Sequence, residues 1–232
     1  MPNDYFSFKQ FTIRQDSCAM KVGTDGTLLG AWARGGNRIL DIGTGTGLLA
    51  LMMAQRFPEA MLVGIDIDEA AVEQAKENVG RSPFCRQIDI LQKDVCQYES
   101  SELFDAIVSN PPYFDHALEC PDAHRTAARH TSSLSYAGLM GAASRLLADE
   151  GEFSIVIPSE CKDRIESEAF LAGFFKVRQC AVKTTPRKPA RRYLLAFRKH
   201  PVDGVEQGEG IIETNPGERS PWYTELTKDF YL

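Results

Sequence analysis

The chain has 232 residues, 43% of them hydrophobic, which suits one large α/β domain with extensions and leaves little room for a second full domain. Its net charge of -6 excludes an evenly basic nucleic-acid-binding coat, so any contact with RNA requires a local basic patch. No apolar run approaches the roughly 18 residues of a membrane span, and the four histidines lack metal-ligand spacing, so we expect neither a membrane-embedded protein nor a metal site.

The first segment predicts a short hairpin, because residues 5–14 alternate apolar and polar side chains around a polar middle. Its buried side chains are expected to be Phe6, Phe8, Phe11 and Ile13. Residues 20–29 contain two glycines and a Thr-Asp pair, which is typical of a turn that leads into a helix. We expect Asp25 or Thr27 to be the N-cap of that helix.

A glycine-rich loop follows the next predicted strand, at residues 38–42, and precedes residues 48–54, which are apolar on nearly all sides. This order of strand, glycine loop and helix is the nucleotide-binding opening of an α/β sheet. A dinucleotide fingerprint of the G-x-G-x-x-G type would require glycine at position 48, where the sequence has Leu48. The loop therefore favours an adenosine-type ligand without a pyrophosphate, or else a plain tight turn.

Two acidic residues come after the next two strands. Residues 61–65 are followed by Asp66, whose carboxylate suits the two hydroxyls of a ribose, although it could serve only as a helix cap. Asp68 is the predicted N-cap of the helix that follows. A strand at residues 88–91 leads to Asp94, at the same edge of the sheet, which suits an adenine amino group or is a solvated loop acid.

A Pro-Pro corner ends the strand predicted at residues 104–108, because prolines cannot continue a β-ladder. Pro111 also pushes Asn110 out of the helical region, so this amide is held at the carboxyl end of a strand, where open α/β sheets bind ligands. The Asn110 side-chain oxygen and the Pro111 carbonyl suit the two N–H groups of a planar amine, and Tyr113 suits a stacking contact with it. Methylation of such a nitrogen needs positioning and preorganised dipoles rather than a general base. The candidate catalytic residues are Asn110, Pro111, Pro112 and Tyr113, and the alternative is a strand that ends in an ordinary Pro-Pro turn.

The connection at residues 114–133 is longer than usual and contains Arg125, Arg129 and His130. We expect it to be a substrate lid, or else a solvated charged loop. Beyond it, we expect helices at residues 136–147 and 159–171 and strands at residues 152–157, 174–182 and 192–197. A basic segment lies between the last two strands and suits nucleic-acid phosphates, or is a solvated hairpin tip. Its candidate RNA-binding residues are Lys183, Arg187, Lys188, Arg191 and Arg192.

The remaining residues are expected to extend this core. Residues 201–219 are rich in glycine, glutamate and proline, which is typical of a linker-like crossing. Residues 221–232 are too aromatic for a disordered tail and are expected to dock on the body of the protein. The six cysteines are scattered without a C-x-x-C pair, and we find no signal peptide, so we expect reduced thiols and a cytoplasmic location.

Together these motifs resemble the class I S-adenosylmethionine-dependent methyltransferases over about residues 20–200. The resemblance implies a Rossmann-like, seven-stranded, mostly parallel sheet with an antiparallel C-terminal hairpin and helices on both faces. It also implies S-adenosyl-L-methionine as the cofactor, with Asp41 at its methionine end, Asp66 at the ribose and Asp94 at the adenine. The candidate cofactor-binding residues are Lys21, Thr24, Asp25, Asp41, Gly43, Gly45, Gly47, Asp66, Asp94, Val95 and Asn110.

More narrowly, the chain is similar from end to end to the bacterial tRNA(Val) adenosine-N6 methyltransferases, which act at position 37 beside the anticodon. The similarity is carried by residues 6–11, 20–26, 110–114, 125–130 and 223–232. It implies that tRNA is the partner and that Lys21, Thr24 and Asp25 belong to a segment that closes over the cofactor. We expect one monomeric methyltransferase domain, with a hairpin and closing segment at residues 1–35, a catalytic core at residues 36–200 and a docked extension at residues 201–232.

Other readings of the chain are less favoured. A protein glutamine-amide methyltransferase acting on release factors would use the same Asn-Pro-Pro-Tyr corner. Such an enzyme usually carries a helical domain before the glycine loop, and only 37 residues precede the strand at residues 38–42 here. A DNA adenine methyltransferase would need a separate target-recognition region. An intact Asn110 and Tyr113 disfavour a non-catalytic binding module, and Leu48 disfavours an NAD-dependent oxidoreductase.

Overall fold

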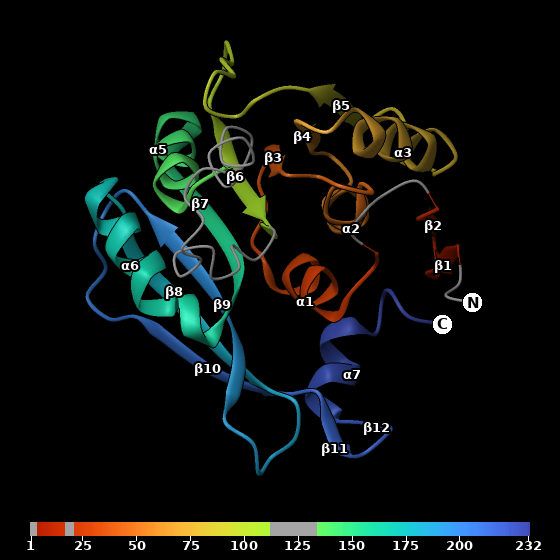
Figure 1. Cartoon of the computed structure of the whole chain (residues 1–232), viewed down its shortest axis with the longest axis vertical. Helices are drawn as coiled ribbons and strands as arrows, with labels where there is room; N and C mark the ends of the chain where they lie inside the picture. Colours follow the sequence, from red (N-terminus) through yellow and green to blue (C-terminus); the bar gives the residue numbers. More distant parts are fainter. Residues whose placement is uncertain (1–3, 17–20, 112–133) are drawn as a thin grey trace, which may run out of the picture.

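The computed structural model describes residues 4–16, 21–111 and 134–232. Within these residues, an eight-stranded sheet forms the centre of the molecule (Figure 1). Its strands, in spatial order, are β10 (Glu206–Ile211), β8 (Phe175–Lys183), β9 (Ala190–Arg198), β7 (Leu147–Pro158), β6 (Phe104–Ser109), β3 (Arg38–Ile42), β4 (Met61–Asp66) and β5 (Ile88–Gln92). The adjacent strands β7, β6, β3, β4 and β5 pair in parallel, whereas β9 is antiparallel to both of its neighbours, β7 and β8. The predicted α/β architecture with an antiparallel C-terminal hairpin is confirmed.

Helices cover both faces of the sheet, and the strand residues alternate between them. In β3, Ile39 belongs to one buried cluster and Leu40 to the other, and β6 divides Val108 and Ile107 in the same way. The first cluster includes residues of α1 (Thr24–Trp32), α2 (Leu48–Arg56), α3 (Glu69–Gly80) and α7 (Pro221–Thr227), and the second includes residues of α5 (Tyr136–Leu146) and α6 (Lys162–Leu171), which follows the short 3-10 helix η1 (Ser159–Cys161). Because both faces are covered, the central strands are nearly continuous apolar runs. No helix in the described ranges is long and apolar enough to cross a membrane.

Two helix starts test the capping predictions. Asp68 caps α3 as predicted, with its carboxylate accepting a hydrogen bond from Ala70 N at 3.2 Å. The prediction that Asp25 or Thr27 caps α1 is wrong, because the helix begins at Thr24 and its N-cap is Gly23, which has no side chain to offer. Thr27 instead donates its hydroxyl to Gly23 O at 3.2 Å, and the Asp25 carboxylate is left for another partner.

The eighth strand differs from the predicted seven-stranded sheet. Residues 201–219 were predicted to be a linker-like crossing, but they contain β10, which pairs in parallel with β8, and the small hairpin of β11 (Glu213–Asn215) and β12 (Glu218–Arg219). The prediction was wrong because β10 lacks an alternating apolar pattern: it is an edge strand held by backbone pairing. Only glycine fits at position 210, because a Cβ there would collide with the Trp222 ring.

The N-terminal hairpin of β1 (Tyr5–Ser7) and β2 (Thr12–Arg14) is antiparallel, as predicted. Its expected core is largely confirmed, because Phe8, Phe11 and Ile13 are buried and Phe6 is half-buried. The C-terminal residues dock beside this hairpin, as expected: Lys9 N donates to Phe230 O at 2.8 Å, and the Phe8 and Tyr231 rings stack at 5.8 Å.

Candidate cofactor and acceptor site

The glycine loop follows β3 and adopts a backbone that only glycine takes up readily. Gly43, Gly45 and Gly47 all have positive φ, at 72°, 55° and 81°. A Cβ at Gly43 or Gly45 would meet no atom within 4 Å, whereas a Cβ at Gly47 would lie 3.4 Å from that of Ala75 in α3. The first two glycines therefore leave open space through which a ligand can approach the backbone, and Gly47 serves the packing of α2 on α3.

Asp41 lies in the core under this loop. One carboxylate oxygen, Oδ2, accepts from Thr44 Oγ1 at 2.7 Å and from Ala50 N at 3.2 Å. The other, Oδ1, is buried and has no hydrogen-bond partner among the described residues. Burial raises the pKa of this carboxyl to about 7, although its hydrogen bonds oppose the shift. A buried, unpartnered acceptor of this kind suits a donor group carried by a ligand.

Asp66, at the end of β4, is tied to the glycine loop. Its Oδ2 accepts from Gly45 N at 2.9 Å and its Oδ1 from Asp68 N at 3.0 Å. A carboxylate has roughly four acceptor positions, so Asp66 keeps capacity for ribose hydroxyls while it holds the loop. The structure therefore places the predicted ribose ligand beside the predicted glycine loop.

Asp94 lies just beyond β5, the strand next to β4. Its Oδ1 accepts from Cys96 N at 2.9 Å and its Oδ2 from Gln97 Nε2 at 3.3 Å, so it caps the turn after the strand. Lys93 N donates to Asp66 O at 2.9 Å, which holds this turn against the end of β4. Val95 is buried in the second cluster.

Asn110 and Pro111 follow β6 at the same edge of the sheet. Ser109 Oγ donates to Ile42 O at 2.8 Å, which links the end of β6 to the end of β3, where the glycine loop begins. Asn110 is half-buried and Pro111 is buried. The predicted catalytic residues Pro112 and Tyr113, and the lid residues Arg125, Arg129 and His130, lie outside the described residues.

The segment predicted to close over the cofactor leads into α1. Lys21 is exposed and Thr24 is half-buried at the first position of the helix. Asp25 turns toward β9, where its Oδ1 lies 2.7 Å from Arg192 Nη1, and the two side chains are only 17% and 18% exposed. Burial raises the pKa of Asp25, and the neighbouring guanidinium partly offsets that rise. A predicted cofactor residue and a predicted RNA residue therefore pair with each other.

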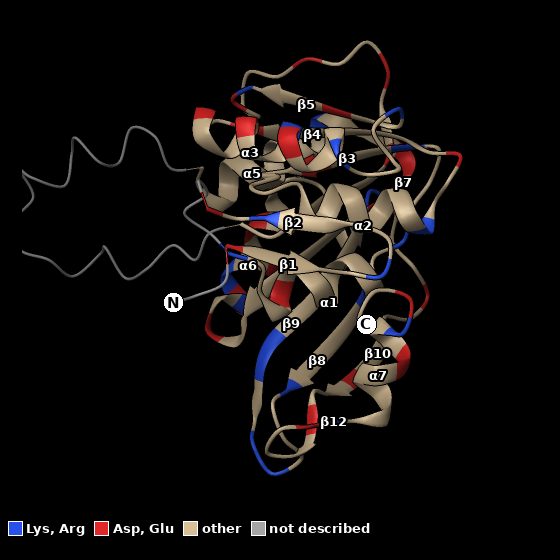
Figure 2. Ribbon diagram, turned by 90° about the vertical axis from the view of Figure 1, so that its right-hand side faces the viewer, with Lys and Arg blue, Asp and Glu red and all other residues tan. Residues whose placement is uncertain are grey.

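The basic segment, residues 183–192, runs from the end of β8 to the start of β9 and contains both paired and exposed cations. Lys183 Nζ lies 2.7 Å from Glu209 Oε2 of β10, so this cation, like Arg192, is paired within the protein. Arg187, Lys188 and Arg191 are exposed. Figure 2 shows basic residues along β9 and on the loop that joins it to β8. Of the five RNA-binding residues predicted in this segment, Arg187, Lys188 and Arg191 are the ones whose charge is exposed.

Asn78 is a site-supporting residue that the sequence analysis missed. Its Nδ2 donates to Arg14 O and to Thr46 O, both at 2.9 Å, and its Oδ1 accepts from Arg14 N at 2.8 Å. It thereby joins the N-terminal hairpin, the glycine loop and α3. The available signal was an asparagine beside the apolar face formed by Val72, Ala75 and Val79.

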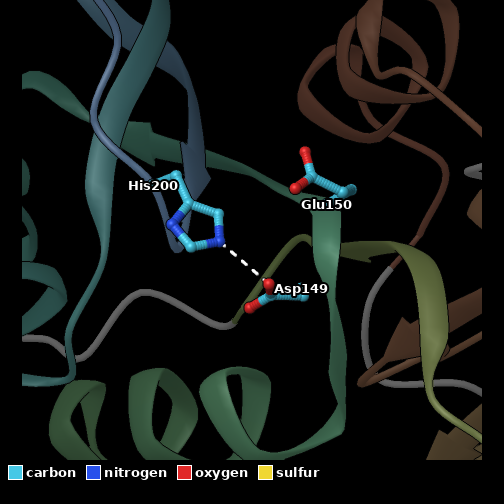
Figure 3. Close-up of side chains that lie close together, drawn as sticks. All are labelled: Asp149, Glu150 and His200. Carbon is cyan, nitrogen blue, oxygen red and sulfur yellow. Dashed lines mark hydrogen bonds and ion pairs between the residues drawn. The ribbon is translucent and has the colours of Figure 1, made fainter.

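A group of three possible metal-ligating side chains lies elsewhere in the described part of the chain. Asp149, Glu150 and His200 are all exposed, and His200 Nε2 is 3.0 Å from Asp149 Oδ2 (Figure 3). The two acids lie near the start of β7, at the edge of the sheet opposite the glycine loop. This group is therefore separate from the candidate site.

The chain is similar to known methyltransferases in sequence and in fold. Residues 26–185 match the family model described as the methyltransferase small domain. The chain is 49% identical to the tRNA1(Val) (adenine(37)-N6)-methyltransferase of Bacteroides thetaiotaomicron, with 100% of this chain and 99% of that protein covered. It is 50% identical to the enzyme of the same name from Phocaeicola vulgatus over the same shares, and 41% identical to that of Yersinia pestis, over 98% of this chain and 93% of that protein.

Solved structures show the same fold at low sequence identity. A predicted O-methyltransferase from Agrobacterium tumefaciens has a TM-score of 0.71 at 19% identity, covering 89% of this chain and 96% of that one. A glycopeptide N-methyltransferase crystallised with S-adenosyl-L-methionine has a TM-score of 0.58 at 11% identity, covering 78% and 90%. With a family model over most of the chain and relatives matched along their full length, this protein belongs to the methyltransferase small-domain family and, within it, to the tRNA1(Val) (adenine(37)-N6)-methyltransferases.

Proposed function

We propose that this chain is an S-adenosylmethionine-dependent methyltransferase that methylates the N6 amine of an adenosine in tRNA, at position 37 beside the anticodon of tRNA1(Val). The observation that carries the proposal is the position of Asn110 and Pro111, directly after β6 and linked through Ser109 to the strand that leads into the glycine loop. This corner occurs in a chain whose full-length relatives are named for that activity.

The described residues fit the proposed cofactor. S-adenosylmethionine, when bound, supplies a methyl group activated by a positively charged sulfur. Asp41 Oδ1 is a buried acceptor that the ammonium of the methionine moiety would satisfy, and Gly43 and Gly45 leave the backbone open to close approach. Asp66 would accept from the ribose hydroxyls, and Asp94 with the Val95 amide would hold the adenine.

The acceptor corner would act by positioning and electrostatics. The Asn110 side-chain oxygen and the Pro111 carbonyl would accept the two N–H groups of the target amine, which favours the developing positive charge on nitrogen. Tyr113 would stack on the base, a contact worth about 1–3 kcal/mol. The adenine must leave its stack to reach this corner, which costs less in an anticodon loop than in a duplex.

The RNA surface would comprise the lid residues together with Arg187, Lys188 and Arg191, whose exposed charges suit loop and stem phosphates. We further propose that the chain works as one monomeric domain in the cytoplasm. Its extension from residue 201 onward would support the core, because α7 supplies Tyr223 to the same buried cluster as α1 and α2.

The substrate proposal is tested by incubating the purified chain with a labelled methyl donor and three acceptors in parallel: bulk tRNA, duplex DNA and a release-factor protein. We expect label in tRNA, recovered as N6-methyladenosine at position 37 of tRNA1(Val), and weak labelling of duplex DNA. Label in the release factor without label in tRNA would replace this proposal with glutamine-amide methylation.

Asn110 provides the matching mutational test. We expect Asn110→Ala to lower kcat by about 100- to 1,000-fold, as the loss of one preorganised hydrogen-bond partner typically does, and to leave cofactor affinity nearly unchanged in calorimetry. Asp66→Ala is the contrasting variant, because it removes the proposed ribose ligand and should weaken cofactor binding markedly. Full activity in Asn110→Ala would show that the corner is only structural.

A further inference from the structure

A partly buried ion pair joins the basic segment to the helix that precedes the glycine loop. Arg192, near the start of β9, lies 2.7 Å from Asp25 in the first turn of α1. Each side chain is less than one-fifth exposed, so water screens this pair less than it screens a surface pair. Its partners come from distant parts of the chain, and it therefore holds α1 against the sheet.

The two neighbouring arginines of β9 have different environments: Arg192 pairs in register with Val182 of β8, whereas Arg191 lies where the register between the two strands shifts. Arg192 lies two residues from Leu194, which belongs to the cluster containing α1 and α2, whereas Arg191 is exposed. Arg192 is also close enough to Tyr223 of α7 that its charge opposes the rise in that hydroxyl's pKa. If Arg192 bound an RNA phosphate instead, the carboxylate of Asp25 would remain partly buried without its counter-charge, and such an unpaired buried charge is destabilising.

The residue next to Asp25 lies close to the acceptor corner. Gly26 is buried, and a Cβ built there would lie 3.0 Å from Leu48 Cδ2 and 3.6 Å from Asn110 Nδ2. Little space therefore separates the backbone of α1 from the amide of Asn110. One peptide bond joins Gly26 to Asp25, so the turn of α1 that carries the ion pair also lies close to this amide.

We propose that the Asp25–Arg192 ion pair is a positioning device for methyl transfer: it sets the first turn of α1 against Asn110. Arg192 then acts on the reaction through Asp25 and Gly26, and not by contact with RNA. The inference rests on the proposed role of Asn110 as the ligand of the acceptor amine. It assigns the basic residues of one short segment to two tasks, with Arg187, Lys188 and Arg191 facing RNA and Arg192 facing inward.

The kinetic experiment compares Arg192→Gln and Asp25→Asn with two reference variants. Arg191→Gln removes the adjacent exposed charge, and Arg81→Gln removes an arginine from an exposed pair with Glu77, away from the site. With saturating cofactor, we expect the two pair variants to lower kcat about 10- to 100-fold, because small misplacements of reacting groups have effects of this size. They should leave the slope of log affinity for tRNA against log salt unchanged.

The reference variants should behave differently. Arg191→Gln should act on the KM for tRNA and reduce the salt slope by about 1, and Arg81→Gln should match the wild type. The double variant of Asp25 and Arg192 should be no slower than the slower single variant, because both changes remove the same interaction. If Arg192→Gln keeps its kcat and loses salt slope as Arg191→Gln does, the inference is wrong and Arg192 is an RNA contact.

A second readout needs no acceptor and separates this inference from the proposed function. The side-chain amide resonances of Asn110 should shift in Arg192→Gln and Asp25→Asn, remain in place in Arg191→Gln, and return toward wild type in the charge-conserving Arg192→Lys. An unshifted amide in both pair variants overturns the positioning role, even if tRNA is methylated. Failure of the wild type to methylate tRNA overturns the proposed function, while the amide shifts still decide the positioning role. Should Arg192→Gln fail to fold, Arg192→Lys and Asp25→Asn carry the comparison.

Discussion

The carboxyl group of Asp41 lies in the core beneath the glycine loop, and the described residues hydrogen-bond only one of its oxygens. A core position optimised for stability alone would not hold such a group, because an ionised carboxylate loses its hydration there. Strongly perturbed carboxyls of this kind gather at functional sites. The raised pKa of Asp41 is therefore a physical signature of the site, independent of any motif.

This residue predicts a specific dependence of stability on pH. Burial raises the pKa of Asp41 from 3.8 to about 7 in the folded protein, so the native state binds this proton more tightly than the unfolded state does. Its contribution to stability is present below the unfolded pKa and is lost as the pH rises to about 7, by an amount on the order of 4 kcal/mol. In Asp41→Asn this loss should be absent.

The measurement is urea unfolding of both proteins without ligand between pH 4 and pH 8. The difference between their free energies of unfolding should change steadily in favour of Asp41→Asn as the pH rises and should level off above about pH 7. Two parallel curves would contradict the burial of this carboxyl.

At the same scale, local patterns predicted some residues well and others poorly. The positions of the glycine loop, Asp66 and Asn110 could be predicted because each lies at the carboxyl end of a strand, and parallel strands end at one edge of the sheet. The pairing of Asp25 with Arg192 could not, because nothing in either local pattern records a partner so far away in the chain. The roles of the individual site residues remain predictions.

Among the elements, β4 shows how tightly the sheet is packed beneath the glycine loop. Gly64 lies where a Cβ would be 2.7 Å from Ile90 Cδ1 and 2.8 Å from Thr44 Oγ1. Gly64→Ala should therefore destabilise the fold by about 1–3 kcal/mol and disturb the bond from Thr44 to Asp41. Urea unfolding and calorimetric cofactor binding should both report the change.

Gly141 supplies the matched control for this substitution. It lies within α5 and is exposed, and a Cβ there would meet no atom within 4 Å. Gly141→Ala should raise stability by about 0.5–1 kcal/mol, because alanine favours the helix and restricts the unfolded chain. If both glycine substitutions have the same effect, packing under the loop is not what makes Gly64 necessary.

The elements also show where sequence patterns stop being informative. The central strands and the helices around them were predictable because burial on both faces imposes long apolar runs and helical periodicity. The edge strand β10 was not, since its exposed residues 206–209 carry glutamates, a glutamine and a glycine. Backbone pairing with β8 and the packing of Trp222 on Gly210 hold it in place, and neither leaves a periodic pattern.

Across the whole molecule, a net charge of -6 coexists with a concentrated group of exposed cations on the loop between β8 and β9 and at the start of β9. Neutralising Arg187, Lys188 and Arg191 together should weaken tRNA binding and lower the slope of log affinity against log salt by about 2–3. A complex with fewer phosphate contacts releases fewer counterions when it forms. Cofactor affinity should stay the same. Fluorescence titrations at several salt concentrations measure this slope.

A charge-matched control removes three exposed cations near the opposite edge of the sheet, Lys76, Arg81 and Arg86. This variant has the same net charge as the first, so it separates local contacts from general repulsion of RNA. An equal loss of slope in both variants would show that RNA responds to overall charge and not to the basic segment at residues 183–192.

The three left-handed glycines of the loop also have a thermodynamic consequence. Glycine loses more conformational freedom on folding than any other residue, and here three of them, at alternate positions, must each be held in one backbone state. A ligand that binds only the folded protein, with this loop ordered, raises the free energy of unfolding by about 2.7 kcal/mol at a concentration of 100 Kd. The melting temperature of the protein should therefore rise with cofactor concentration, and thermal unfolding becomes a measure of cofactor affinity that requires neither RNA nor methyl transfer.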